Sequence, residues 1–446
     1  MKNAVSGVGL APDAAMVTFP IDMFLPGSDL AAISARKREF YNGLTQWQST
    51  FKVGAPEAAA LLSVEGRSYE DALQQANNLL LTNLWGDGLP VWPATEERVD
   101  WILRGSALPR THRLGKFPPR GGVTTVETCA IALAMAGGRP EYLPVLIAAV
   151  EACLEPAALF DQLQATSGGP FPVVIVNGPI AKDIRLNSGF GCLGPDPQRP
   201  AGASIGRALR LMQQNVGGAL PGIGTMAIYG AMRYTNAVFA EDEASLPEGW
   251  EPHGTRRHGF ERGTNSVSVY FASGVTNIRR RGAKKETPEE DVTQGLYRMA
   301  DFMRTPNFAA LAGWETGTPG AMMISPVVAG MMAKLGWTPK KLQDFLWEHS
   351  KIPMKDIKRA GGVAWIEIDP SPAARDSLKL DPWPIAQKPE NLIFIVAGGD
   401  HPTHSQWLQA HSPAVVGKMI RTPETFDRLL AESDRDLGCG SEECRI

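Results

Sequence analysis

The segment from Asn391 to Leu408 concentrates the residue types that could carry out chemistry. An apolar run breaks there at two glycines and continues as DHPTHSQWL, and three of the chain's seven histidines, His401, His404 and His411, lie in this string or just beyond it. The ordinary pKa of histidine is near neutrality, so a histidine can act as a general acid or base at physiological pH. We therefore expect His404 to be a catalytic acid/base residue.

The residues before this string indicate where it lies in the fold. Leu392–Val396 is a continuous apolar run of the kind that forms a strand buried on both faces, and Gly398 and Gly399 allow the backbone to turn sharply after it. In an open α/β sheet, ligands bind beyond the carboxyl ends of the strands. The expected substrate-binding residues of this segment are therefore Asp400, His401 and Ser405.

A metal site is an alternative use of the histidines. His401 and His404 are three residues apart, a spacing that would put both on one face of a helical turn. However, no Cys/His cluster earlier in the chain has a recognised ligand spacing, so the sequence favours acid/base chemistry and predicts no metal site. Histidines that are merely hydrogen-bonded within a loop are the other alternative.

A glycine-rich segment, Val176–Pro195, is the second candidate for a binding site. It matches neither the Walker pattern nor the dinucleotide-binding fingerprint, but its turn could present backbone N–H groups to an anion. An ordinary structural loop is the alternative. The expected substrate-orienting residues are Asn177, Asn187 and Ser188, with Arg207 of the following helix as an anion clamp.

Two further residues could take part in catalysis. Cys192 lies in the glycine-rich segment, where backbone donors could activate its thiolate as a nucleophile, although a single cysteine more often serves in packing. Asp87 lies in LWGDGLPVWP, a stiff loop that could present it as the acid/base partner of His404. The alternative for Asp87 is a turn in which it bonds its own backbone.

The C-terminal string LGCGSEECRI contains two more thiols. Cys439 and Cys444 could form a mobile redox pair that delivers electrons or sulfur to the site. A flexible tail with two exposed thiols and no function is the alternative.

The elements that must position these residues follow from periodicity. Helical spacing precedes strand-like FPVVIVN, and helices and strands then alternate to the end, which predicts an α/β fold with a mixed or mainly parallel sheet covered by helices. Ser68, Thr95 and Thr338 are expected to cap the starts of three of the helices. Two segments have the same predicted order of strand, proline and helix, namely FPVVIVNGPIAKDIRL and GAMMISPVVAGMMAKL. This internal repeat indicates two related lobes, which could share one site. The predicted organisation is an extension at 1–65, lobes at 66–240 and 241–435, and a tail at 436–446.

Composition bounds the class of protein. The formal net charge of −3 gives no electrostatic basis for binding nucleic acid or an anionic membrane. The N-terminus lacks the layout of a secretory signal, and five cysteines do not suggest a disulfide framework. We expect a cytoplasmic homo-oligomer.

Several long motifs together resemble a bacterial family associated with the UGSC (seleno)protein group. The resemblance covers about Tyr69 to Thr422 and is carried by GDGLPVWPATEERV, AMAGGRPEYLPVLIAAVEA, QATSGGPFPVVIVNGPIAKDIRLNSG, ASIGRALRLMQQNVGG and VAGGDHPTHSQW. Members of the group occur beside, or fused to, a small domain with selenocysteine or cysteine before Gly-Ser-Cys. This chain has only Cys439-Gly440-Ser441-Glu442, so the resemblance implies either that a small cysteine or selenocysteine redox protein is a separate partner or that the C-terminal tail takes its place.

These observations predict an enzyme, an oxidoreductase or a lyase, that acts on a small polar or anionic organic molecule. The chemistry would be thiol-linked redox or the making and breaking of carbon–heteroatom bonds. One alternative is a lyase or hydrolase without redox, with Cys192 as nucleophile or passive. Another is a noncatalytic subunit that presents substrate to a thiol or selenol protein. The sequence identifies no cofactor.

Overall fold

The structure is a computed structural model that describes residues 17, 29–48, 50, 61–230, 236–280, 287–305, 314–367 and 371–438. The side chains of Trp365 and His411 are not described. Most of the predicted N-terminal extension and both tail cysteines, Cys439 and Cys444, lie outside the described residues.

A mixed sheet of seven strands forms the centre of the molecule, in the order β4-β3-β5-β8-β6-β7, with β9 also paired to β5. The pairs β3/β4 and β6/β7 are parallel and the other four are antiparallel, which confirms the predicted α/β fold with a mixed sheet. The strands are β3 (Phe171–Asn177), β4 (Ala237–Ala240), β5 (Ser266–Arg279), β6 (Thr318–Ile324), β7 (Ile393–Val396), β8 (His404–Ser412) and β9 (Val416–Met419). A separate hairpin consists of β1 (Arg113–Phe117) and β2 (Gly122–Thr125).

Two halves of this sheet repeat one topology. In the first half β3 pairs with parallel β4 and antiparallel β5, and the early part of β5 then pairs with β9. In the second half β6 pairs with parallel β7 and antiparallel β8, and β8 then pairs with the later part of β5. The order β4-β3-β5-β9 is thus matched by β7-β6-β8-β5, as expected for the two related lobes. Because β5 belongs to both halves, the sheet is continuous between them.

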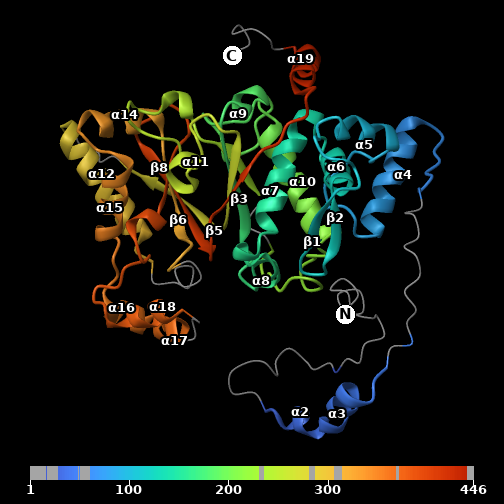
Figure 1. Cartoon of the computed structure of the whole chain (residues 1–446), viewed down its shortest axis with the longest axis horizontal. Helices are drawn as coiled ribbons and strands as arrows, with labels where there is room; N and C mark the ends of the chain where they lie inside the picture. The colour runs from blue at the N-terminus through green and yellow to red at the C-terminus, as the bar shows by residue number, and fades with distance from the viewer. Residues whose placement is uncertain are drawn as a thin grey trace.

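Helices cover the outside of each half (Figure 1). The first half has α4 (Tyr69–Thr82), α5 (Glu96–Leu103), α6 (Val126–Met135), α7 (Leu143–Cys153), α8 (Phe160–Ala165), α9 (Ile180–Asp183), α10 (Ala201–Asn215) and α11 (His253–His258). The second half has α12 (Pro288–Met303), α14 (Pro326–Lys334), α15 (Pro339–His349), α16 (Met354–Arg359), α17 (Gly362–Glu367) and α18 (Pro372–Asp376). Near the termini lie α2 (Ala31–Ala35), α3 (Lys37–Thr45) and α19 (Phe426–Leu437).

Local sequence signals explain where several helices begin. Ser68, Thr95 and Thr338 were expected to start helices, and each accepts a hydrogen bond from a backbone N–H of the first turn of α4, α5 and α15, respectively. Such a side-chain acceptor satisfies one of the N–H groups that have no partner within the helix. These three predictions are confirmed.

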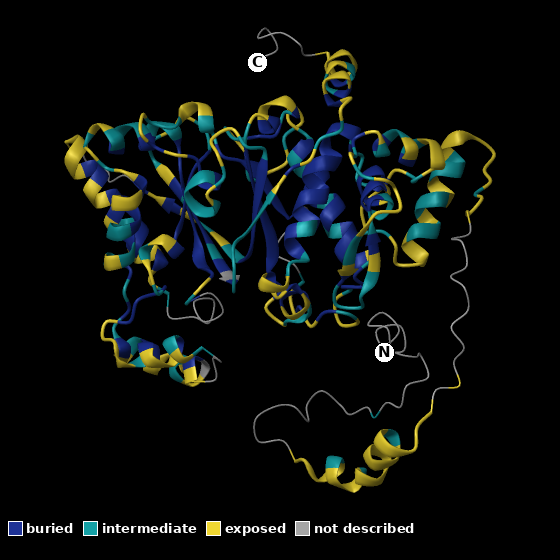
Figure 2. Ribbon diagram, in the orientation of Figure 1, coloured by how far each residue is buried: buried dark blue, intermediate teal, exposed yellow. Residues whose placement is uncertain are grey.

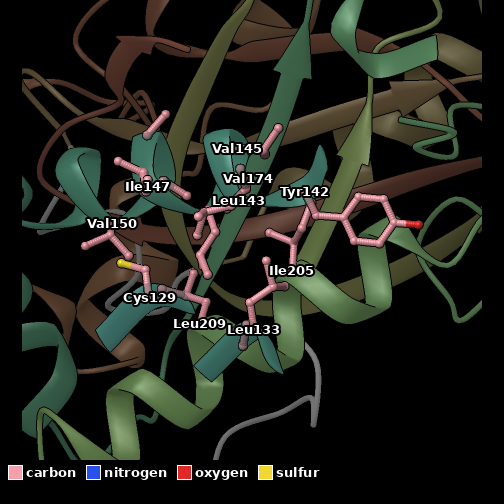
Figure 3. Close-up of a cluster of buried hydrophobic side chains, with 14 of the residues drawn as sticks. Cys129, Leu133, Tyr142, Leu143, Val145, Ile147, Val150, Val174, Ile205 and Leu209 are labelled. Carbon is pink, nitrogen blue, oxygen red and sulfur yellow. The ribbon is translucent and has the colours of Figure 1, made fainter. Parts of the chain in front are cut away.

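Three apolar clusters form the core. One packs α6, α7 and α10 against the outer face of the first half, and its Leu143, Val174 and Ile205 are drawn in Figure 3. A second packs α12, α14 and α15 against the outer face of the second half. The third lies on the opposite face of the sheet and joins both halves, with Val173, Phe239, Tyr270, Met323 and Ile395 among its members. Figure 2 shows the strands as the buried centre of the molecule.

The region of the histidines differs from the prediction. Leu392–Val396 was expected to form a strand, and Ile393–Val396 are β7. The helical turn considered for His401 and His404 as a metal site is not formed, because β8 begins at His404, and β8 and β9 follow β7 as two further strands. Trp407 and Leu408 of β8 are buried on opposite faces of the sheet, in the second and third clusters, which stabilises an extended backbone there. Among the described residues, no helix is both long and apolar enough to span a bilayer.

Candidate functional site

A cavity of about 300 Å³ lies where β6 and β7 end and β8 begins. The loop between α9 and α10 forms its other wall, so residues from both halves line it. The lining residues are Phe190, Gly191, Cys192, Leu193, Gly194, Met323, Ser325, Ala397, Gly398, Gly399, His401, His404, Ser405 and Gln406. The glycine-rich segment and the histidine segment, which the sequence singled out separately, therefore meet at one site.

Backbone contacts hold the two walls together. The N–H of Gly398 donates to the carbonyl of Ser188 at 2.7 Å, and the N–H of Asp242 donates to the carbonyl of Val396 at 2.8 Å. At Gly399 a Cβ atom would lie 2.1 Å from the ring of Phe190, so only glycine allows this close approach. The glycines after β7 thus serve to bring the first half against the second.

Asn187 fixes the shape of the glycine-rich loop. Its Oδ1 accepts hydrogen bonds from the N–H of Gly189 and from Arg199, and its Nδ2 donates to the carbonyl of Phe190 and to Asp196. Asn187 and Ser188 were predicted to bind substrate, but neither lines the cavity. In the structure both residues position the wall that carries Cys192.

His404 is held by a neighbouring strand. Its Nδ1 lies 3.1 Å from Oδ1 of Asn277 in β5, and its side chain is exposed at the cavity. His401 is also exposed, with its Nδ1 2.7 Å from the hydroxyl of Thr403. The hydroxyl of Ser325 donates to the carbonyl of His401 at 2.8 Å and so fixes the turn between the two strands.

Ser405 lines the cavity, but its hydroxyl does not face it. In β8 it is paired with Ile278 of β5 and Ile324 of β6, whose side chains belong to the second apolar cluster, so its side chain points to the face of the sheet opposite His404 and Gln406. The residue is 3% exposed, and its Oγ is buried with no hydrogen-bond partner among the described residues. The substrate contact predicted for this side chain is therefore not found.

Cys192 belongs to both the cavity and the core. It lines the cavity, is buried, and is a member of the apolar cluster shared by the two halves. Among the residues that the structure describes, it is the one cysteine that lines this cavity. This position allows either the nucleophilic role or the packing role that the sequence left open.

Asp87 and Arg207 lie elsewhere, and the roles predicted for them need correction. Both carboxylate oxygens of Asp87 accept hydrogen bonds of 2.8 Å from Arg207, which also donates to the carbonyl of Pro90. Burial tends to raise the pKa of Asp87, but the hydrogen bonds and charge of Arg207 outweigh it and lower the pKa below its usual value. Neither residue lines the cavity, so Asp87 is not the partner of His404 and Arg207 is not its anion clamp. The pair joins the 84–93 loop to α10.

Asn177 is part of a buried polar network at the end of β3. Its Nδ2 donates to Glu241 and Glu243, both at 2.8 Å, and its Oδ1 accepts from the N–H of Gly254. Burial raises the pKa of Glu241, against the opposing charge of Arg256. Asn177 is 3% exposed and does not line the cavity, so the predicted contact with substrate is not found.

The other predicted residues are placed as follows. Asp400 is exposed beside the cavity but does not line it. The described residues contain no group of three or more His, Cys, Asp or Glu side chains that could hold a metal ion. Cys439 and Cys444 belong to the part of the chain that is not described, so their redox role stays a prediction.

Sequence reasoning missed Asn277, Ser325 and Gln406. Asn277 lies late in β5, and only the pairing of β5 with β8 brings it to His404. Ser325 did carry a signal, because it follows β6 and precedes Pro326 as the N-cap of α14. Gln406 is within the histidine string itself, and strand alternation would have placed it on the same face as His404.

No family model, curated protein or solved structure matched this chain in the comparisons. The functional argument therefore rests on the residues of the cavity.

Proposed function

We propose that this protein is an enzyme that makes or breaks a carbon–heteroatom bond in a small polar organic molecule bound in the cavity. The observation that carries the proposal is the meeting of an imidazole, a thiol and a side-chain amide, those of His404, Cys192 and Gln406, in one cavity. A general base, a potential nucleophile and a hydrogen-bond donor are the parts that such chemistry uses.

The lining favours an uncharged substrate over an anionic one. Among the described residues, no lysine, arginine, aspartate or glutamate lines the cavity. Apolar side chains, including Leu193 and Met323, lie beside the polar ones. An ionised group placed there would lose hydration without a permanent opposite charge to compensate, so a neutral carbonyl compound with an apolar part fits better.

The roles follow from the contacts. His404 accepts a proton from the attacking group, which is the Cys192 thiol or a water molecule, and returns it to the leaving group. The side-chain amide of Gln406 donates to the substrate oxygen, on which negative charge develops. The second half supplies His404 and Gln406, and the first half supplies the thiol.

Other features of the sequence stay proposals. A cytoplasmic location, assembly into a homo-oligomer and membership of the UGSC-associated family are compatible with this function. A redox variant of the chemistry would need a second thiol from Cys439, Cys444 or a separate small protein.

A turnover assay tests the proposal. Neutral amides, esters, thioesters and ketones would be incubated with the protein and followed by NMR. His404→Gln should reduce turnover at least ~100-fold, the lower range of what a general base contributes, without changing the thermal unfolding temperature. His112→Gln is the matched control because His112 is exposed and does not line the cavity. Full activity of His404→Gln would overturn the assignment.

Thiol labelling decides the role of Cys192. Cys129 and Cys153 are fully buried, and burial raises the pKa of both thiols, so iodoacetamide should react slowly with them. In a background with Cys439→Ser and Cys444→Ser, inactivation that disappears with Cys192→Ser, together with loss of turnover in that variant, supports a nucleophile. An active Cys192→Ser variant would assign the attack to water instead.

A further inference from the structure

The pairing of β5 with β8 places an amide beside the proposed base. Asn277 lies opposite Gln406 in the register, and Arg279 lies opposite His404. Asn277 and His404 are thus diagonal neighbours on one face of the sheet, a relation in which long side chains can meet. Oδ1 of Asn277 lies 3.1 Å from Nδ1 of His404 and also accepts a hydrogen bond of 3.4 Å from Nε2 of Gln406.

This contact determines which nitrogen of His404 carries the proton. An amide oxygen can only accept a hydrogen bond, so Nδ1 must be the donor. In neutral imidazole only one ring nitrogen is protonated, which leaves Nε2 with a free lone pair. A histidine side chain in water favours the opposite tautomer, with the proton on Nε2. A base that acts through Nε2 therefore needs a partner that reverses this preference.

We propose that Asn277 is a positioning residue that holds His404 as the Nδ1–H tautomer, so that Nε2 is the basic atom at the cavity. Gln406 supports this arrangement because its Nε2 donates to the same oxygen and so keeps the amide of Asn277 turned with Oδ1 toward His404. The catalytic consequence rests on the proposed function. The tautomer itself does not, because it follows from the hydrogen bond alone.

A comparison of the two histidines that line the cavity also distinguishes His404 from His401. His401 is held through Nδ1 by the hydroxyl of Thr403, which can donate or accept and therefore specifies neither tautomer. His404 alone of the two faces an obligate acceptor. The structure thus distinguishes His404 as the histidine with a fixed protonation pattern.

The tautomer can be measured without any substrate. With histidine-selective ¹⁵N labelling, two-bond ¹H–¹⁵N correlation spectra separate the Nδ1–H and Nε2–H forms, and His404→Gln assigns the signals. We expect Nδ1–H for His404 in the unaltered protein and a shift toward Nε2–H in Asn277→Ala. Thr403→Val is the matched control, since it removes a contact of His401 and should leave the signals of His404 unchanged.

An acidic replacement gives an independent readout. Asn277→Asp keeps an obligate acceptor, so Nδ1–H should persist, and it adds a negative charge that attracts the imidazolium form. The acid limb of the pH profile of kcat/KM should then move to higher pH. In Asn277→Ala, kcat/KM should fall about 10-fold to 100-fold while thermal stability is retained, because the base spends most of its time in the wrong tautomer.

The outcomes separate the two proposals. Nε2–H in the unaltered protein, or an unchanged spectrum in Asn277→Ala, overturns the positioning role. If the spectra follow the expectation but His404→Gln keeps full turnover, then the general-base role fails and the assignment of the tautomer remains.

Discussion

At the scale of single residues, the roles follow from whether a side chain's hydrogen-bonding capacity is already used. Asp87 and Asn177 have their polar atoms bonded to protein groups, whereas the amide of Gln406 lines the cavity and donates one of its two N–H groups to Asn277. From sequence Asp87 and Asn177 were plausible as site residues because each follows or precedes a turn. Their hydrogen-bond partners, Arg207 for Asp87 and Glu241 for Asn177, lie 120 and 64 positions away in the sequence. No local sequence pattern predicts such contacts.

Asp87→Ala should destabilise the protein without reducing the activity of the folded fraction. The side chains of Asp87 and Arg207 are 3% and 16% exposed, so removal of the carboxylate leaves a largely buried guanidinium unpaired. The expected loss is about 3 kcal/mol of unfolding free energy, as for other buried ion pairs. Urea unfolding of Asp87→Ala, Arg207→Ala and the double variant measures it. Additive losses would show that the pair does not act as a unit.

His258 should make stability depend on pH in the acidic range. Burial, with a smaller effect of the Arg257 charge, lowers its pKa to about 4, below the value of ~6.5 expected when the chain is unfolded. The unfolded chain therefore binds more protons between these two pH values, and stability falls as the pH drops from about 6.5 to about 4. His253, whose pKa burial also lowers, acts in the same direction.

His258→Gln tests this linkage, since glutamine can still bond the hydroxyl of Ser268 that His258 contacts. The urea midpoint of this variant should fall less steeply between pH 6.5 and pH 4 than that of the unaltered protein. Identical slopes would mean that His258 does not titrate across folding.

At the scale of elements, capping signals and apolar periodicity predicted most helices and the strands β3, β6 and β7. The strands that complete the site were harder to predict. His404–Ser412 contains two histidines and two glutamines, so it lacks the continuous apolar run that is typical of a strand buried on both faces, although Trp407 and Leu408 are buried on opposite faces. Its strand character comes from β5 and β6, which flank it on both sides.

The pairing of β6 with β8 depends on Gly320. A Cβ atom there would lie 2.5 Å from the indole of Trp407 and 2.6 Å from the carbonyl of Leu408. Gly320→Ala should therefore cost about 1–3 kcal/mol of unfolding free energy through overpacking. Gly330→Ala is the matched control, because it lies within α14 with open space around it and should be more stable by about 0.5–1 kcal/mol. Equal effects on the urea midpoint would refute the packing argument.

At the scale of the whole molecule, the repeated topology of the two halves explains why the site lies where it does. The end of β3 is filled by the buried network of Asn177 and Glu241, while the corresponding end of β6 opens at Ser325 into the cavity. The sequence predicted two related lobes that share one site, but not that the end of only one of the two equivalent strands would open into it. The start of α11 fills the end of β3, where the N–H groups of His253 and Gly254 donate to Glu241 and Asn177.

The shared sheet should make the two halves unfold together. β5 belongs to both, and one apolar cluster has members on strands of each half. Calorimetric unfolding should therefore give a single transition that coincides with the loss of tryptophan fluorescence and of helical circular dichroism. Two separate transitions would show that the halves are independent domains.

The most direct test of the central claim is a crystallographic soak of this protein with small neutral amides, esters and ketones. The account predicts electron density in the cavity, with a probe oxygen within hydrogen-bond distance of the side-chain amide nitrogen of Gln406 and the probe between Cys192 and His404. An empty cavity, with the same probes bound reproducibly at another site, would contradict it.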